Sequence, residues 1–330
     1  MNRLKLSLAL TSNEFSRPLI DGSVRAQGVD FVPTLLHPSE MYWRQLRFGD
    51  FDVSEMSLAS LFIARAQGDL RWSALPVFTM RRFFHTKILV HTAAGIERPE
   101  QLIGKRVGVP EYQQTAAVWC RGVLQHEFGV NPRDVHWFME RNADKSHGAA
   151  TGFVPPPGVR IDRIASDSSI GDMLEKGELD ATLLYLNTGN LVDRSSAKLS
   201  PNAVRSLFAD PDAESHRYYA KTGLLPINHT VVVRTALLEQ HPWLALNLYT
   251  AFCEARQHAR QASRAVNEIH FATGVLTPDA QRLLSRDLAP YGVRAARREL
   301  ETISTLLHEQ GLTPNALELD QVLWHSTLDL

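Results

Sequence analysis

The chain has 330 residues, of which 44% are hydrophobic and 22% charged, and its formal net charge is −1. This length is enough for two domains, and the composition is that of a globular protein, not of a disordered, fibrous or membrane-embedded one. Lys and Arg (35) balance Asp and Glu (36), so the chain lacks the basic surplus that a nucleic-acid partner requires. The two cysteines, Cys120 and Cys253, are expected to be buried free thiols, because they are too few for a disulfide framework.

Apolar and polar residues alternate over residues 4–10, which predicts a β-strand. A signal peptide needs an unbroken apolar core of roughly 7–15 residues, and this alternation interrupts any such core. No stretch approaches the roughly 20 apolar residues of a membrane span. We therefore expect a cytoplasmic protein with no membrane partner.

The next elements alternate between strands and amphipathic helices. The patterns predict strands over 51–56, 72–77 and 84–90 and helices over 39–48 and 58–66. This βαβαβ order favours a parallel sheet with right-handed crossovers.

A second unit of the same kind begins near Arg98. Strands are predicted over 106–109, 135–139, 161–165 and 181–185, and helices over 99–102, 113–128 and 170–175. The stretch 187–214 has weak periodicity and is expected to cross back to the first unit. A strand over 229–234 and helices over 236–238, 243–262, 278–284 and 297–309 complete the chain.

These elements predict a two-lobed α/β protein with a ligand cleft between the lobes. Lobe I is expected to contain residues 1–92 and 226–330, lobe II residues 93–190, and the crossover segment residues 191–225. In open α/β sheets, ligands lie beyond the carboxyl ends of the strands and at helix N-termini. The segments that follow the strands are therefore the places to look for a site.

Six segments carry a resemblance to a known family. They are residues 51–58 (FDVSEMSL), 76–78 (PVF), 104–112 (GKRVGVPEY), 115–119 (TAAVW), 177–181 (GELDA) and 226–234 (PINHTVVVR). Together they resemble the 4,5-dihydroxyphthalate decarboxylase family, a branch of the type II periplasmic-binding-protein fold. The resemblance implies lobes built on mixed, mostly parallel sheets flanked by helices. Residues 186–196 depart from the family's pattern, at the place where a ligand contact from the second lobe is expected.

The resemblance also implies a reaction: loss of CO2 from a dihydroxylated aromatic dicarboxylate, giving protocatechuate, without an organic cofactor. A general acid must protonate the ring carbon that bears the carboxylate, and His has a suitable pKa for that role. His229 is the first candidate and His85 the second, with Glu111 as a further candidate. For each histidine the alternative is a structural residue bonded to the backbone or satisfied in the core. For Glu111 the alternative is an ordinary acidic residue in the first turn of a helix.

Candidates for substrate binding follow the predicted strands. Arg81 and Arg82 could hold a carboxylate with a guanidinium fork, or could be surface arginines. Ser54 and Ser57, at a strand-to-helix turn, could receive a carboxylate, and capping of the next helix is the alternative.

Three further polar residues complete the predicted binding set. Thr115, near the start of a helix, could hold an anion, and Tyr112 could stack on an aromatic ring or donate to a phenolate. Asn228 is expected to face the cleft, because polar groups at the mouth of a buried strand need partners.

We expect neither a metal nor another cofactor. His85, Glu111 and His229 could in principle form a carboxylate–histidine site, but no short-range ligand motif such as His-Glu-x-x-His occurs. The expected partner is a small aromatic carboxylate, and a homo-oligomer is compatible with the sequence.

The sequence leaves two alternative functions open. One is a non-catalytic solute-binding protein for an aromatic or sulfonate anion. The other is another lyase on the same scaffold, similar to the chorismate-derived dehydratases.

Overall fold

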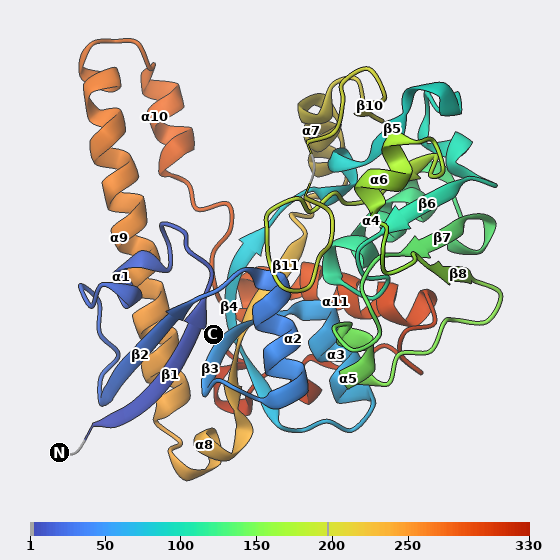
Figure 1. Ribbon diagram of the computed structural model, residues 1–330. Helices are drawn as coiled ribbons and strands as arrows, with labels where there is room; N and C mark the ends of the chain where they lie inside the picture. Colours follow the sequence, from blue (N-terminus) through green and yellow to red (C-terminus); the bar gives the residue numbers. More distant parts are fainter. Residues whose placement is uncertain (1–2, 197) are drawn as a thin grey trace.

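The computed structural model describes residues 3–196 and 198–330, and its strands form two sheets (Figure 1). The first sheet has the strand order β2-β1-β3-β11-β4. Its strands are β1 (Leu4–Leu10), β2 (Val29–Leu35), β3 (Val53–Ser57), β4 (Trp72–Arg81) and β11 (Ile227–Arg234). Strand β1 is parallel to β2 and β3, whereas β11 is antiparallel to β3 and β4, so the sheet is mixed, and not parallel throughout.

The second sheet has the order β10-β5-β9-β6-β7-β8. Its strands are β5 (Leu89–His91), β6 (Arg106–Val109), β7 (His136–Met139), β8 (Arg160–Arg163), β9 (Ala181–Thr182) and β10 (Val204–Ser206). Strands β9, β6, β7 and β8 run parallel, and β5 is antiparallel to β9 and β10. The architecture is therefore α/β with two mixed sheets, as the sequence predicts.

Helices flank both sheets (Figure 1). They are α1 (Arg17–Ile20), α2 (Pro38–Phe48), α3 (Leu58–Ala66), α4 (Thr115–Phe128), α5 (His147–Thr151), α6 (Ile170–Glu175), α7 (Pro211–Thr222), α8 (Thr235–Gln240), α9 (Leu244–Ala272), α10 (Pro278–Ser285) and α11 (Val293–Glu309). None of the described helices is both long and apolar enough to cross a membrane.

The segment 84–90 differs from the strand that the sequence predicts. Phe84–Lys87 form a 3₁₀ turn, and only Leu89–His91 form a strand, which belongs to the second sheet. The reason is that the chain leaves the first sheet after Arg81 and crosses between the sheets here. The lobe boundaries at residues 92 and 226 stay predictions.

Strand β11 lies inside the first sheet, between β3 and β4, and Val231, Val232 and Val233 have no exposed surface. The prediction begins this strand at His229, but it begins at Ile227. Asn228 and His229 therefore lie within the ladder, and their positions are fixed by backbone pairing rather than by a loop.

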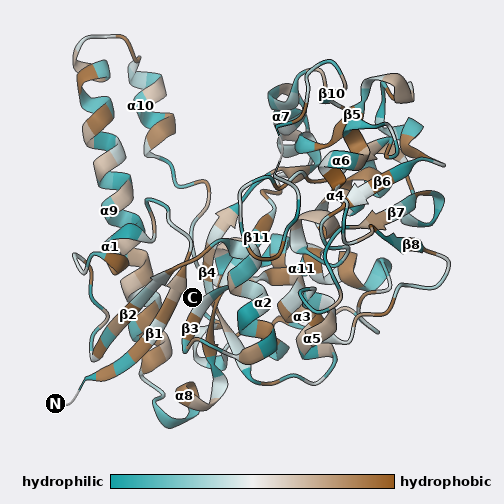
Figure 2. Ribbon diagram, in the orientation of Figure 1, coloured by the Kyte–Doolittle hydropathy of each residue, from teal (hydrophilic) through white to brown (hydrophobic). Residues whose placement is uncertain are grey.

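Helix α9 and the shorter α10 form a hairpin that projects from the body of the molecule, at the upper left of Figure 1. We call residues 260–288 the arm. Helix α10 has no buried residue, and brown, hydrophobic positions are visible along the arm in Figure 2. The arm therefore makes almost no contribution to the core.

Candidate active site

A cavity of about 190 Å³ lies where strands of both sheets end. Its polar lining includes Arg82, Arg141 and the histidines His37, His147 and His229, and none of the described residues that line it is Asp or Glu. Other lining residues are Pro38, Ser39, Tyr42, Ser57, Met80, Phe84, Gln114, Thr115, Ala116, Leu184, Leu186 and Asn228. Such a lining favours a small anionic ligand, and the volume is below the roughly 300–1,000 Å³ of sites for drug-sized molecules.

Four larger hollows lie elsewhere, and the two largest are less suited to a small anion. One, of about 570 Å³, lies between α9 and α10 and is lined mostly by exposed residues of the arm. The other, of about 700 Å³, lies beside the start of β4, far from the ends of the strands that meet between the sheets. The cavity between the sheets is therefore the candidate site.

His229 is held against a buried carboxylate. Its Nδ1 lies 3.4 Å from Oε2 of Glu55, whose side chain is fully buried on the neighbouring strand β3. The edge of the Tyr42 ring contacts the imidazole, with 5.0 Å between ring centroids and 83° between ring planes. This arrangement directs Nδ1 toward Glu55 and leaves Nε2, on the opposite side of the ring, for the cavity.

Glu55 is an ionised carboxylate in this environment. Burial acts to raise its pKa, but the neighbouring His229 and the hydrogen bonds from Thr11 outweigh burial and hold the pKa below its usual value. Thr11 donates from its backbone N–H (2.7 Å) and its hydroxyl (2.6 Å), and Thr79 donates its hydroxyl at 2.7 Å. A fixed negative charge therefore stands behind His229, 3.4 Å from its Nδ1.

The other two histidines of the cavity are poor proton donors. Burial, together with the Arg141 guanidinium, lowers the pKa of His147 to about 3. Burial also lowers the pKa of His37, whose ring accepts the N–H of Ser39 at the start of α2. Both rings are therefore neutral near pH 7, and His229 alone among the three stands beside a carboxylate.

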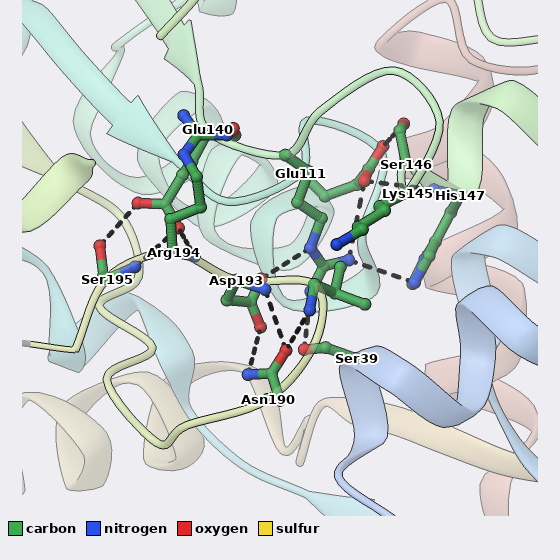
Figure 3. A network of polar contacts seen from close by, with 12 residues as sticks. Ser39, Glu111, Glu140, Lys145, Ser146, His147, Asn190, Asp193, Arg194 and Ser195 are labelled. Atoms are coloured by element: carbon green, nitrogen blue, oxygen red, sulfur yellow. Dashed lines mark hydrogen bonds and ion pairs between the residues drawn. The ribbon is translucent and has the colours of Figure 1, made fainter. Parts of the chain in front are cut away.

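Arg141 reaches the cavity from the segment that follows β7. Its guanidinium donates to Asp193 (2.7 Å), to Ser39 (2.7 Å) and to Nε2 of His147 (3.1 Å). Glu111 lies 3.6 Å away and is itself bonded to Ser146 (Figure 3). Arg141 is thus a rigid, buried cation whose orientation is fixed on three sides.

The segment 187–196 has a defined structural role. It supplies Asp193 to Arg141, and Asn190 bonds to Asp193 in turn (Figure 3). Ser195 donates its hydroxyl to Glu140 at 2.6 Å, which anchors the end of the segment beside the second sheet. Through Asp193 the segment therefore contributes one of the contacts that fix the Arg141 guanidinium.

Hydroxyl groups connect the two sheets at the floor of the cavity. Ser57, at the end of β3, bonds to Thr115 at the start of α4, with 2.9 Å between the oxygens. Ser60 bonds to Ser57 at 3.1 Å and to Nδ1 of His147 at 3.2 Å. Ser57 and Thr115, both predicted from the sequence, are thus brought together in the lining of the cavity.

The two predicted arginines have different surroundings. Arg82 is exposed and lines the cavity, and no described carboxylate pairs with its guanidinium. Arg81 does not line the cavity: its guanidinium is buried against Glu299 (3.2 Å) and the carbonyl of Pro290 (2.9 Å). Only Arg82 is free to meet an anion.

Four other predicted residues lie outside the cavity lining. His85 is buried against Glu214 (3.2 Å), and burial lowers its pKa to about 4. Ser54 is buried inside the first sheet, and Tyr112 is buried under Arg121, whose guanidinium carbon lies 3.7 Å from the ring centroid. Glu111 is close to the site but acts on it through Arg141, and burial raises its pKa.

Sequence reasoning missed Arg141, His147, Tyr42 and Gln114 as cavity residues. Arg141 comes two residues after the end of β7, so the strand-end rule that selects Arg82 would also have selected it. Tyr42 lies on a helix face that is typical of the core, and its packing against His229 and His147 distinguishes it.

The described residues contain no group of three or more His, Cys, Asp or Glu side chains arranged to hold a metal ion. The three residues considered from the sequence have separate partners: His85 has Glu214, Glu111 has Ser146, and His229 has Glu55.

The site can be compared with known proteins. No protein-family model matches the sequence. A 4,5-dihydroxyphthalate decarboxylase from Comamonas testosteroni is 33% identical over 336 residues, which cover 100% of this chain and 99% of the relative. The chain belongs to the 4,5-dihydroxyphthalate decarboxylase family. A second member of this family of carboxy-lyases, from Pseudomonas putida, is 38% identical over 183 residues, or 56% of this chain and 71% of that protein.

Solved structures share the fold of this decarboxylase-family chain. The alkanesulfonate-binding protein SsuA from Xanthomonas axonopodis pv. citri, bound to MOPS, superposes with a TM-score of 0.56 and 13% identity over 98% of each chain. The periplasmic aliphatic sulphonate-binding protein SsuA from Escherichia coli gives 0.54 and 14%, covering 99% of this chain and 93% of the other. At this identity the likeness concerns the fold alone, and it confirms the predicted periplasmic-binding-protein-like architecture.

Proposed function

We propose that the chain decarboxylates a dihydroxylated aromatic dicarboxylate, 4,5-dihydroxyphthalate, to protocatechuate and CO2 without a cofactor. The observation that carries the proposal is His229, which lines a cationic cavity and has the buried Glu55 carboxylate 3.4 Å behind it. Family membership supports the same reaction.

The chemistry needs one proton at one ring carbon. A hydroxyl para to a carboxylate raises the electron density at the carbon that bears that carboxylate. His229 donates its proton to this carbon, the carbon–carboxylate bond breaks, and its electron pair restores the aromatic ring as CO2 leaves. The proton taken from His229 is replaced from solvent. A positioned acid of this kind contributes typically 10²–10⁴-fold to a rate.

The carboxylates of the substrate must be held while this happens. Arg82 provides a guanidinium without a protein counter-ion, and Arg141 provides a fixed positive charge from the other sheet. The paired hydroxyls of Ser57 and Thr115 also line the cavity. Positioning of this kind supplies the orientation that the reaction requires.

The alternative is a solute-binding protein for an aromatic or sulfonate anion, and the shared fold is the feature that favours it. A site that only binds anions gains nothing from a buried carboxylate behind its lining, because like charges repel. The Glu55–His229 pair therefore favours the catalytic function.

Incubation of the purified protein with 4,5-dihydroxyphthalate tests the proposal, with CO2 release and protocatechuate as readouts. We expect turnover with the unmodified chain and a loss of at least about 100-fold in His229→Ala, with an unchanged circular dichroism spectrum. Reversible, saturable binding with no product would instead identify a binding protein, and full activity in His229→Ala would remove His229 from the mechanism.

We also propose that the chain forms a homo-oligomer and works in the cytoplasm. The projecting arm supports the first proposal, because a helix as short as α10 is unstable in water without packing. Cys120 and Cys253 are both free, as is usual in a reducing compartment, and this supports the second. Fractionation of the producing cells would test the location.

A further inference from the structure

Asn228 is a buried amide whose orientation is determined by its neighbours. Its side chain is on β11, the residue is 1% exposed, and it lines the cavity. Its Nδ2 group donates to the carbonyl oxygens of Pro226 (3.1 Å) and Arg82 (3.4 Å). Two carbonyl oxygens can face only the nitrogen end of an amide, so Oδ1 must be the atom on the other side.

No hydrogen-bond donor among the described residues reaches Asn228 Oδ1. Gln114, which precedes α4 and also lines the cavity, has a buried Oε1 that likewise receives no hydrogen bond from the described residues. Buried acceptors are nearly always paired, and leaving one unpaired is costly. These two oxygens therefore need O–H or N–H donors from whatever occupies the cavity.

The cavity thus makes two different chemical demands. Arg82, which pairs with no described carboxylate, requires a negative oxygen, whereas Asn228 Oδ1 and Gln114 Oε1 require donors. A plain dicarboxylate or a sulfonate satisfies the first demand and leaves both acceptors unpaired. A ring that carries carboxylate groups and two hydroxyls satisfies both.

We infer that Asn228 and Gln114 bind the two ring hydroxyls of the substrate and make hydroxylation, in addition to negative charge, a requirement for tight binding. The inference rests on the proposed function, since it assigns the hydroxyls of the same substrate. A protein oxygen that accepts a hydrogen bond from a phenol O–H of the substrate also promotes the reaction. The hydroxyl becomes a stronger donor as positive charge develops on the protonated ring, so this bond strengthens in the transition state.

Two ligands that are not turned over test the inference: protocatechuate, with two hydroxyls, and benzoate, without them. Calorimetry on the unmodified protein should show protocatechuate binding at least about 10-fold more tightly than benzoate. In Asn228→Leu and in Gln114→Met this ratio should fall several-fold, while the Kd of benzoate, which uses only the anion contacts, stays the same.

Benzoate also detects structural damage. If Asn228→Leu displaces Arg82, benzoate affinity falls together with that of protocatechuate, and a purely structural role would replace the inference for Asn228. Gln114→Met keeps the test valid if Asn228→Leu does not fold. A ratio near one in the unmodified protein, or an unchanged ratio in both variants, would overturn the inference. Because turnover of 4,5-dihydroxyphthalate is measured separately, loss of the proposed function and loss of this inference are distinguishable.

Discussion

His229 Nδ1 lies 3.4 Å from Glu55 Oε2, across adjacent antiparallel strands of the first sheet. The register of β11 against β3 places His229 opposite Ser57, and Glu55 two residues earlier on β3 faces the same side. The histidine and its carboxylate are therefore positioned by backbone pairing, which is more rigid than a loop. The hydroxyls of Thr11 and Thr79 fix the carboxylate in turn.

Removal of the Glu55 charge should change the pH dependence of turnover. The Glu55 pKa is held below its usual value, so the carboxylate is ionised at all pH values at which the enzyme is assayed. In Glu55→Gln the negative charge 3.4 Å from His229 Nδ1 is gone, so proton donation by this imidazole no longer has a carboxylate behind it. We expect the alkaline limb of the kcat/KM profile to move to lower pH. An unmoved limb, measured between pH 5 and pH 9, would separate Glu55 from the proton donor.

Arg82 and Arg81 are adjacent in sequence and provide a matched pair. Arg82→Gln removes the unpaired cation of the cavity and should lower kcat/KM by roughly 10–100-fold, since a hydrogen bond to a charged group contributes about 1.5–3 kcal/mol. Arg81→Gln breaks the buried contact with Glu299 and should lower the melting temperature with a much smaller effect on kcat/KM. The reverse pattern in steady-state kinetics would exchange the roles of the two arginines.

Elements that depend on local signals could be predicted from the sequence. Strand β1, helix α3 and strand β6 have the predicted bounds, because alternation and helical periodicity lie within each segment. Strand β2 was missed, because Pro33 interrupts its pattern. The proline is tolerated within β2 because β2 is an edge strand of the first sheet.

The candidate site was only partly predictable, because some of its contacts join residues that are far apart in the sequence. His229, Ser57 and Thr115 were found because they are at strand ends or helix starts, where the rule for α/β sheets applies. His85 satisfies the same rule in sequence, but a 3₁₀ turn directs it into the core against Glu214. The importance of Arg141 depends on Asp193, 52 residues away, and no local pattern reports such a pairing.

Asp193 should be important for stability as well as for the site. In Asp193→Asn the Arg141 guanidinium keeps its charge and loses its closest anionic partner in a buried position, which typically costs about 3–5 kcal/mol. Urea denaturation measures this loss. Asp162→Asn is the control: Asp162 is half-exposed beside His136 and Arg160, and surface pairs contribute about 0–1 kcal/mol. Equal stability of the two variants would contradict the buried role of Arg141.

Stability should fall on acidification before the carboxylates titrate. The pKa values of His85 and His147 are lowered to about 4 and about 3 by burial, whereas an unfolded histidine titrates near 6.5. Below pH 6.5 the unfolded chain therefore binds more protons than the folded one, and the free energy of unfolding decreases as the pH falls. Each histidine should cost about 2 kcal/mol between pH 7 and pH 5. Denaturant titrations at these two pH values measure the loss, and His85→Gln should reduce it by about half; an identical loss in that variant would exclude His85 as a source.

The arm should mediate self-association. Val266, Ile269, Val275, Leu283, Leu284 and Leu288 are each more than half exposed on it. Buried together they would remove several hundred Å² of apolar surface per chain, a large share of the roughly 800 Å² that each partner buries in a standard interface. Two arms related by a two-fold axis would pack as a four-helix bundle, in which each chain covers the apolar residues of the other.

The change that tests this surface is Leu283→Glu combined with Leu284→Glu. The unmodified chain should sediment at a multiple of 37.0 kDa, and the double variant should sediment as a monomer with the sheets of the body intact. Leu70→Glu is the matched control, because Leu70 is 63% exposed but lies in the loop between α3 and β4, away from the arm. A monomeric unmodified chain, or a double variant with an unchanged mass, would show that the arm serves another purpose.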